Sequence, residues 1–149
     1  MKKITLVILV TTLLGGCAAS GTSKPLKTKD TRQCAQNLTY SGSFLMGRTY
    51  KSHVFIKGVS KNTAMQRAAR YISSDGWSIT NTDKDLGIIS ASQTVSFGQG
   101  KTVPLNITIE SKNSGVNVSM SYATSGGLIT PLGAIQTKFC DTMAAIAGK

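Results

Sequence analysis

The clearest pattern in the chain is a two-residue alternation of apolar and polar positions in three successive runs. The runs span residues 89–97, 103–110 and 116–122, and glycine-containing turns at 98–100 and 113–115 separate them. Successive side chains of a strand point to opposite faces of its sheet. The pattern therefore predicts an antiparallel meander with one buried face and one polar face.

Two other segments carry apolar residues at helical spacing. The first runs from about Lys61 to Asp75, with Ser60 as a plausible N-cap and Gly76 just past its end. The second runs from Ala134 to Ala147. Its apolar face is formed by Ile135, Phe139, Met143 and Ile146.

Further strands are expected around these elements. Tyr50–Val59 has a strand-like core, and a short strand is expected before it at Phe44–Met46. Trp77–Thr80 predicts another short strand, which leads into a turn at Asn81–Asp85. The predicted order is β-α-β-β-β-β-α. It indicates an α+β fold in which an antiparallel sheet of about five strands carries two helices on one face.

This order resembles the TATA-binding-protein-like, or helix-grip, topology. The segment Ala64–Ser92, with Gly76-Trp77 after the helix and Asp85-Leu86-Gly87-Ile88-Ile89 beyond, is also similar to the periplasmic domains of BamC-type lipoproteins. The resemblance implies an envelope-assembly accessory or scaffold, and it assigns no functional residue.

The N-terminus has the pattern of an export signal. Lys2 and Lys3 precede an apolar run, Ile4–Leu14, that is shorter than the roughly 20 residues a membrane-spanning helix needs. The next residues, Leu14-Gly15-Gly16-Cys17, resemble the lipobox of bacterial lipoproteins. The resemblance implies cleavage before Cys17 and acylation of that residue with lipid chains such as palmitate, which is sufficient for stable anchoring.

This interpretation divides the chain into three regions. Residues 1–16 are expected to be the lipoprotein signal peptide, 17–33 the lipidated cysteine and a flexible tether, and 34–149 a single α+β periplasmic domain. The tether is rich in Ser, Thr, Lys and Gly and has no apolar periodicity. Ala18 follows the cysteine, and by analogy with enterobacterial lipoproteins this implies the outer membrane, facing the periplasm, with the inner membrane as the alternative.

The other two cysteines, Cys34 and Cys140, are expected to form a disulfide. An exported chain meets an oxidising compartment, where two remaining cysteines favour a structural bridge. The bridge would close a loop of roughly a hundred residues and tie the start of the domain to the last helix.

The chain is basic, with a formal net charge of +11. Such a charge can attract nucleic acid, an anionic membrane or an acidic partner. The export signal argues against nucleic acid, and the sequence has neither a basic helix nor an RNA-binding motif. The expected partners are the membrane, through the lipid anchor, and a candidate envelope protein.

No pattern in the sequence predicts catalysis, a metal site or a cofactor. His53 is the single histidine and has no recognisable catalytic neighbour. Asp83 and Asp85 lie in a predicted turn, where aspartates are favoured for local hydrogen bonding. We therefore expect a protein that is not an enzyme.

One loop is unusually apolar and is the candidate partner-binding site. It contains Leu128, Ile129, Pro131 and Leu132. These residues either close the core under the last helix or form a docking or membrane-dipping loop. The polar face of the meander is a second candidate surface, formed by Ser90, Ser92, Thr94, Asn106, Thr108, Asn117, Ser119 and Ser121.

Two functions fit these features. The first is a membrane-anchored, non-catalytic interaction or scaffold module. The alternative is a binding protein for a lipid or small apolar ligand in a groove between sheet and helices. Small residues such as Ala64, Ala68, Ala144 and Ala145 could leave room for such a groove.

Replacing the lipobox cysteine tests the predicted address. Bacteria that express the chain and are fed an alkyne-labelled palmitate should label the wild-type protein but not Cys17→Ala, because the thiol of Cys17 carries the lipid. A Cys34→Ala, Cys140→Ala variant is the control and should still be labelled. Label retained on Cys17→Ala would contradict the prediction.

Overall fold

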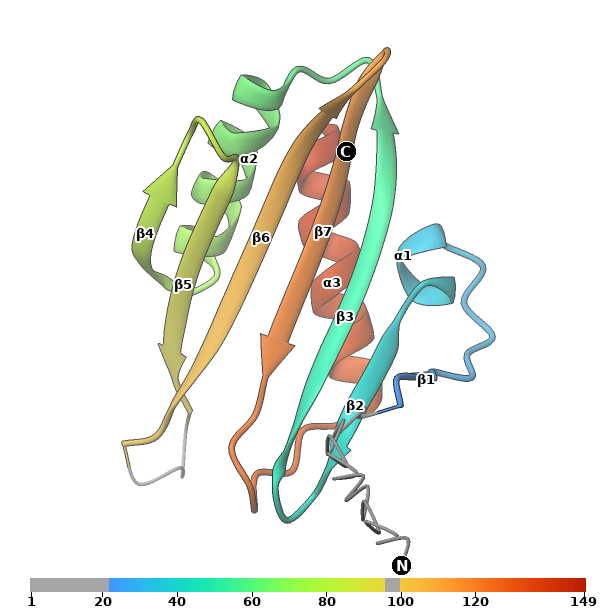
Figure 1. Cartoon of the computed structure of the whole chain (residues 1–149), viewed down its shortest axis with the longest axis vertical. Coiled ribbons are helices and arrows are strands. Elements are labelled where there is room, and N and C mark those ends of the chain that lie inside the picture. The colour runs from blue at the N-terminus through green and yellow to red at the C-terminus, as the bar shows by residue number, and fades with distance from the viewer. Residues whose placement is uncertain (1–21, 96–99) are drawn as a thin grey trace, which may run out of the picture.

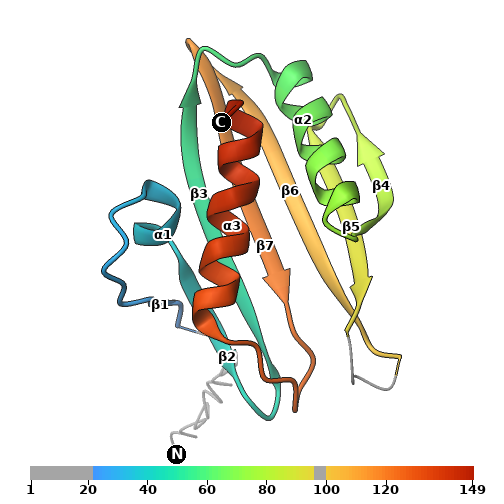
Figure 2. The same cartoon turned by 180° about the vertical axis from the view of Figure 1, so that it is seen from behind.

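The computed structural model describes residues 22–95 and 100–149, so the predicted signal peptide and Cys17 lie outside the described residues. Its centre is one antiparallel sheet with the strand order β1-β2-β3-β7-β6-β5-β4. Helices α2 and α3 cover one face of the sheet, and α1 lies beside β3 (Figures 1 and 2). The elements are β1 (Lys24–Pro25), α1 (Gln33–Gln36), β2 (Thr39–Ser43), β3 (Gly47–Lys57), α2 (Lys61–Ser74), β4 (Ser78–Asp83), β5 (Ile88–Thr94), β6 (Thr102–Lys112), β7 (Gly115–Ala123) and α3 (Leu132–Ala147).

The predicted α+β class and the antiparallel meander are confirmed. β5 pairs with β6 and β6 with β7, each antiparallel. The apolar positions of the alternation face the helices and are buried, whereas the polar positions lie on the opposite face. The buried set includes Ile89, Ala91, Leu105, Ile107, Ile109, Val116, Val118 and Met120. Phe97, the last position of the first run, lies outside the described residues.

Helix α2 carries the chain from the middle of the sheet to its far edge. It leaves β3, which pairs with β7, and leads to β4, the edge strand beside β5. Ser60 caps the helix as predicted, since its Oγ accepts a hydrogen bond from the Thr63 backbone N–H at 3.2 Å. Gly76 follows the helix with φ +85°, a conformation that favours glycine.

The sheet has more elements than the pattern predicted: seven strands and three helices among the described residues, against about five strands and two helices. The predicted strand at Phe44–Met46 is wrong, because these residues form the exposed turn between β2 and β3. Asn81–Asp83 belong to β4, so the predicted turn begins later, at Lys84. There, Asp83 Oδ1 accepts a hydrogen bond from the Leu86 backbone N–H at 2.8 Å.

The N-terminal segment packs on the domain ahead of the predicted boundary at Cys34. β1 pairs with β2, and the Leu26 backbone N–H donates to the Leu38 carbonyl at 2.9 Å. Residues 24–33 were expected to belong to a flexible tether because they lack apolar periodicity. In the structure, backbone pairing and polar side chains hold these residues. Neither kind of interaction produces an apolar periodicity in the sequence.

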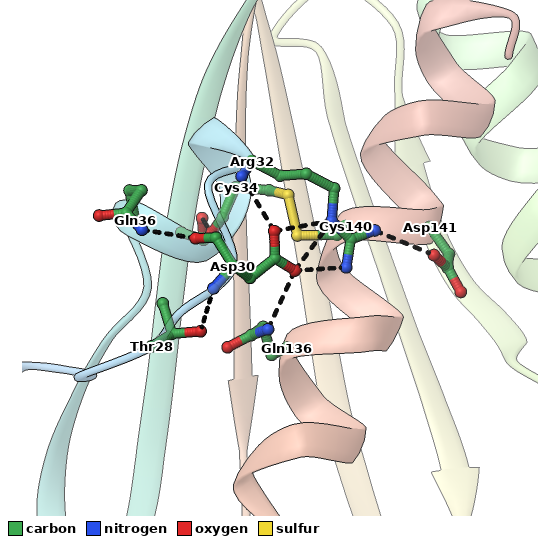
Figure 3. Close-up of polar contacts among 9 residues, drawn as sticks. Thr28, Asp30, Arg32, Cys34, Gln36, Gln136, Cys140 and Asp141 are labelled. Atoms are coloured by element: carbon green, nitrogen blue, oxygen red, sulfur yellow. Dashed lines mark hydrogen bonds and ion pairs between the residues drawn. A yellow bond between two sulfur atoms is a disulfide. The ribbon is translucent and has the colours of Figure 1, made fainter.

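A disulfide between Cys34 and Cys140 joins α1 to α3, as predicted (Figure 3). The two Cα atoms are 5.3 Å apart and the cysteines are 106 residues apart in sequence. Both side chains are buried in the core. Ser52 on β3 donates a hydrogen bond to the Cys34 carbonyl at 2.6 Å, which ties α1 to the sheet as well.

Asp30 forms a polar cluster beside this disulfide (Figure 3). Its carboxylate accepts hydrogen bonds from Arg32 Nη2 at 2.7 Å and from Gln136 Nε2 of α3 at 3.1 Å. Arg32 also lies 3.5 Å from the carboxylate of Asp141. The hydrogen bonds from Arg32 lower the pKa of Asp30 from 3.8 to about 2. The cluster therefore stabilises the fold above the ordinary pKa, and this contribution is lost as the pH falls towards about 2.

Within the described residues, no helix is both long and apolar enough to cross a membrane.

Removing the disulfide should destabilise the domain. The bridge closes a long loop, and loss of a native disulfide from a small exported domain lowers the free energy of unfolding by about 2–5 kcal/mol. Urea denaturation of a chain beginning at Ala18 should show this loss for Cys34→Ala, Cys140→Ala. Dithiothreitol should destabilise the wild type and leave the double variant unaffected. An unchanged unfolding midpoint in the variant would count against the bridge.

Candidate functional site

A cavity of about 180 Å³ lies between the sheet and the first turns of α3. α2 ends at Ser74, whereas α3 continues along the sheet beyond that point (Figure 2). Only one helix therefore covers the sheet there, which leaves the space unfilled. The lining residues come from the α2–β4 connection, β5, β6, β7, the loop before α3, and α3 itself: Trp77, Gln93, Leu105, Met120, Tyr122, Thr130, Ala134, Ile135, Lys138 and Phe139.

The floor and one wall of the cavity are apolar. Leu105 on β6 is the register partner of Tyr122 on β7, and Met120 lies on the same face of β7. Above them, Ile135 and Phe139 of α3 are one helical turn apart and are both buried. Strand period and helix period thus place apolar side chains on both sides of the same space.

Aromatic side chains form the far wall. Trp77 meets Tyr122 edge to face, with ring centroids 6.0 Å apart. Tyr122 in turn stacks on Tyr50 of β3 at 6.2 Å, and Tyr50 lies 6.3 Å from Tyr40 of β2. These tyrosines are direct cross-strand neighbours. Aromatic contacts of this kind stabilise the sheet by more than the burial of their apolar surface alone, and they give the wall a fixed shape.

Polar groups occur at the rim. Lys138 of α3 forms an ion pair with Asp75 at the end of α2, and the partnership raises the pKa of Lys138. Burial raises the pKa of Tyr122, while the side chain of Thr130 acts in the opposite direction. Gln93 Nε2 lies 3.4 Å from the carbonyl oxygens of Asp75 and Gly76. The charged groups at the rim therefore neutralise each other, and the interior remains apolar.

This combination of features is typical of a ligand-binding site. Ligand sites are concave, mostly apolar and carry a few polar groups that fix orientation. An apolar protein cavity of about 150 Å³ holds a molecule the size of benzene. The cavity here has room for an aromatic ring or the end of an acyl chain, and it is smaller than the sites that enclose a whole drug-sized ligand.

None of the four alanines predicted to leave room for a groove, Ala64, Ala68, Ala144 and Ala145, lines this cavity. Ala64 and Ala68 are fully buried in the core. Ala144 lines a separate, shallower hollow beside the disulfide. The small residue that borders the cavity is Ala134, at the start of α3. Helical spacing placed α3 correctly but did not show which of its alanines face an unfilled part of the sheet.

The apolar loop before α3 lies next to the cavity without forming its lining. Ile129 and Pro131 are exposed, Leu128 is partly buried, and Leu132 is exposed at the first position of α3. Thr130, between them, is the loop residue that borders the cavity. The structure also brings Phe44 beside this loop, since the Gly127 backbone N–H donates to the Phe44 carbonyl at 2.9 Å.

The other residues considered from the sequence lie away from this cavity. Four residues of the predicted polar surface, Asn106, Thr108, Ser119 and Ser121, line an open hollow on the other face of the sheet together with His53. Asp83 and Asp85 lie at the β4–β5 turn, away from the cavity. In the part of the chain that the structure describes, no three His, Cys, Asp or Glu side chains form a potential metal site.

Two residues of the cavity were missed by sequence reasoning, Trp77 and Tyr122. Both were placed on strands, but their contact joins the end of α2 to a strand more than forty residues away in sequence. The alternation along β7 places Tyr122 on the same face as the buried Val116, Val118 and Met120, and this was the available signal.

Comparisons with known proteins show a fold and no family. No protein-family model matches the sequence, and no curated protein does. Among solved structures, that of Ara h 8.0201 is similar with a TM-score of 0.51 and 11% identity; the match covers 68% of this chain and 96% of that one. CalU16 from Micromonospora echinospora has a TM-score of 0.44 and 8% identity, over 75% of this chain and 98% of that one. The likeness to Ara h 8.0201 is one of fold.

Proposed function

We propose that this chain is a lipid-anchored envelope protein whose domain binds a small apolar ligand between its sheet and α3. The observation that carries the proposal is the apolar cavity with its aromatic wall and sparse polar rim. The ligand class is an aromatic molecule or a short acyl chain, because a cavity of about 180 Å³ admits a body of that size.

The cavity favours ligand binding over a pure scaffold role. A domain that only presents a surface gains nothing from leaving an apolar pocket open to solvent, since the lining side chains forgo burial and packing contacts. Here the space is bordered by Phe139, Leu105 and Met120, whose side chains are otherwise well buried. An occupant would restore those contacts.

The anchor and the location remain part of the same proposal. The lipobox-like run ending at Cys17 supports acylation, and Ala18 supports export to the outer membrane. The positive charge of the chain supports retention near an anionic surface.

Filling the cavity should weaken binding. Octanoate and 1-naphthoate are suitable probes, since each joins an apolar body to one carboxylate. The wild-type chain from Ala18 onward should bind one or both, with heat in calorimetry and a change in the fluorescence of Trp77, the only tryptophan. Ala134→Phe and Leu105→Phe should weaken binding by about tenfold or more, as loss of a buried apolar contact of roughly two methylenes implies.

Thr137→Phe is the matched control, because Thr137 is exposed on the same helix and does not border the cavity. It should bind the probes like the wild type. Thermal unfolding identifies any variant that fails to fold. Equal binding by Ala134→Phe, Leu105→Phe and Thr137→Phe, or no binding by the wild type, would refute the proposed site.

A further inference from the structure

A group of large apolar side chains projects into solvent at one end of the sheet. Leu45, Met46 and Ile129 are 81%, 86% and 83% exposed, and Phe44 and Leu132 are 45% and 38% exposed. These five residues, here called the tip patch, come from the β2–β3 turn and the start of α3 with its preceding loop. Contiguous exposed apolar residues of this size mark an interaction surface in a soluble domain.

The two loops of the tip patch are fixed to each other. The Gly127 backbone N–H donates to the Phe44 carbonyl at 2.9 Å, and the Thr124 N–H donates to the Arg48 carbonyl at 2.8 Å. Gly126 lies so close that a Cβ there would be 2.0 Å from the Leu45 carbonyl oxygen. These backbone contacts hold the two loops in one arrangement, and in that arrangement the five apolar side chains are exposed.

The two loops of the tip patch carry no acidic residue, and Arg48 and Lys101 lie at the same end of the sheet. Residues 39–50 and 111–140, which include both loops, contain no Asp or Glu. Arg48 is the second residue of β3; its guanidinium carbon lies 5.7 Å from the centre of the Tyr40 ring and its Nε is buried. β3 and β6 both pair antiparallel with β7, so they run in the same direction. Since Tyr50 of β3 and Leu105 of β6 both lie opposite Tyr122, Lys101, just before β6, lies at the same end of the sheet as the start of β3. Apolar tips with a basic surround match an anionic lipid surface.

The first described residues of the chain lie towards this end of the sheet. β1 runs antiparallel to β2, with Lys24 opposite Tyr40, so going back from Pro25 to Lys24 leads towards the β2–β3 turn. Cys17 is seven residues before Lys24, and a fully extended chain of that length reaches about 25 Å. A lipid on Cys17 would therefore keep the tip patch close to the bilayer that holds it.

We infer that the tip patch docks on the surface of an anionic phospholipid membrane. Leu45, Met46 and Ile129 enter the boundary between headgroups and acyl chains, while Arg48 and Lys101 face the phosphates. The inference goes beyond ligand binding, and it uses the proposed anchor at Cys17 to set the orientation. Thr130 lies next to Ile129 and borders the cavity, so docking brings the rim of the cavity to the lipid surface.

Photo-crosslinking in a membrane tests this orientation. The full-length chain, with benzoylphenylalanine at Leu45 or at Ile129, is reconstituted into vesicles of phosphatidylethanolamine and phosphatidylglycerol and illuminated. Ser114 is the matched control position, since it is exposed in the β6–β7 turn at the other end of the sheet. Mass spectrometry then measures covalent protein–phospholipid adducts. Co-flotation of each probe variant with the vesicles, measured before illumination, confirms that the chain is membrane-bound.

We expect the yield of phospholipid adducts at Leu45 and at Ile129 to exceed the yield at Ser114 by about tenfold or more, because these large apolar side chains are buried in lipid. Adding Met46→Asp to the Ile129 probe should reduce its adducts severalfold. Equal lipid adducts at all three positions, or adducts to a second protein chain in place of lipid, would overturn the inference. Binding of octanoate or 1-naphthoate, measured in parallel, reports on the cavity separately.

Discussion

The covalent link between α1 and α3 is the constraint on which the arrangement of this domain depends. Cys34 and Cys140 join segments that are 106 residues apart, one before the first long strand and one in the last helix. The same place is reinforced by Asp30, which accepts hydrogen bonds from Arg32 and from Gln136 of α3. α3 is thereby held over β3 and β7 by contacts that do not require a large core, which suits a domain of this size.

The cavity follows from this way of fastening α3. At one end, α3 packs beside α2, where Arg67 donates to the Ile146 carbonyl at 3.1 Å. Towards its start, α3 extends past the end of α2, and the ion pair between Lys138 and Asp75 spans the two helices. A helix held by a disulfide and polar bridges need not collapse onto the sheet below it. The aromatic contact of Trp77 with Tyr122 supports the opposite wall.

Sequence periodicity predicted the parts of the fold whose stability comes from burying an apolar face. The meander and both long helices are of this kind, and the cap at Ser60 was visible as well. It missed β1, β2 and α1 because these elements are too short to show a period. β1 is held to β2 by backbone pairing, and α1 is held by the disulfide and by burial of Cys34 and Ala35. The strand expected at Phe44–Met46 was wrong for a related reason: an apolar run indicates burial in general, but here the residues form a turn that the sheet exposes. The cavity could not be predicted, since its lining comes from six separate segments of the chain.

Hydrogen–deuterium exchange of the oxidised and reduced protein tests most directly whether the disulfide positions α3. After reduction, we expect faster exchange in α1 and in the first turns of α3, around Ile135, with little change in the paired strands β5, β6 and β7. Such a difference would show that the wall of the cavity depends on the link to Cys34. Equal exchange in α3 before and after reduction, or a uniform increase across the sheet, would show that the disulfide does not position α3.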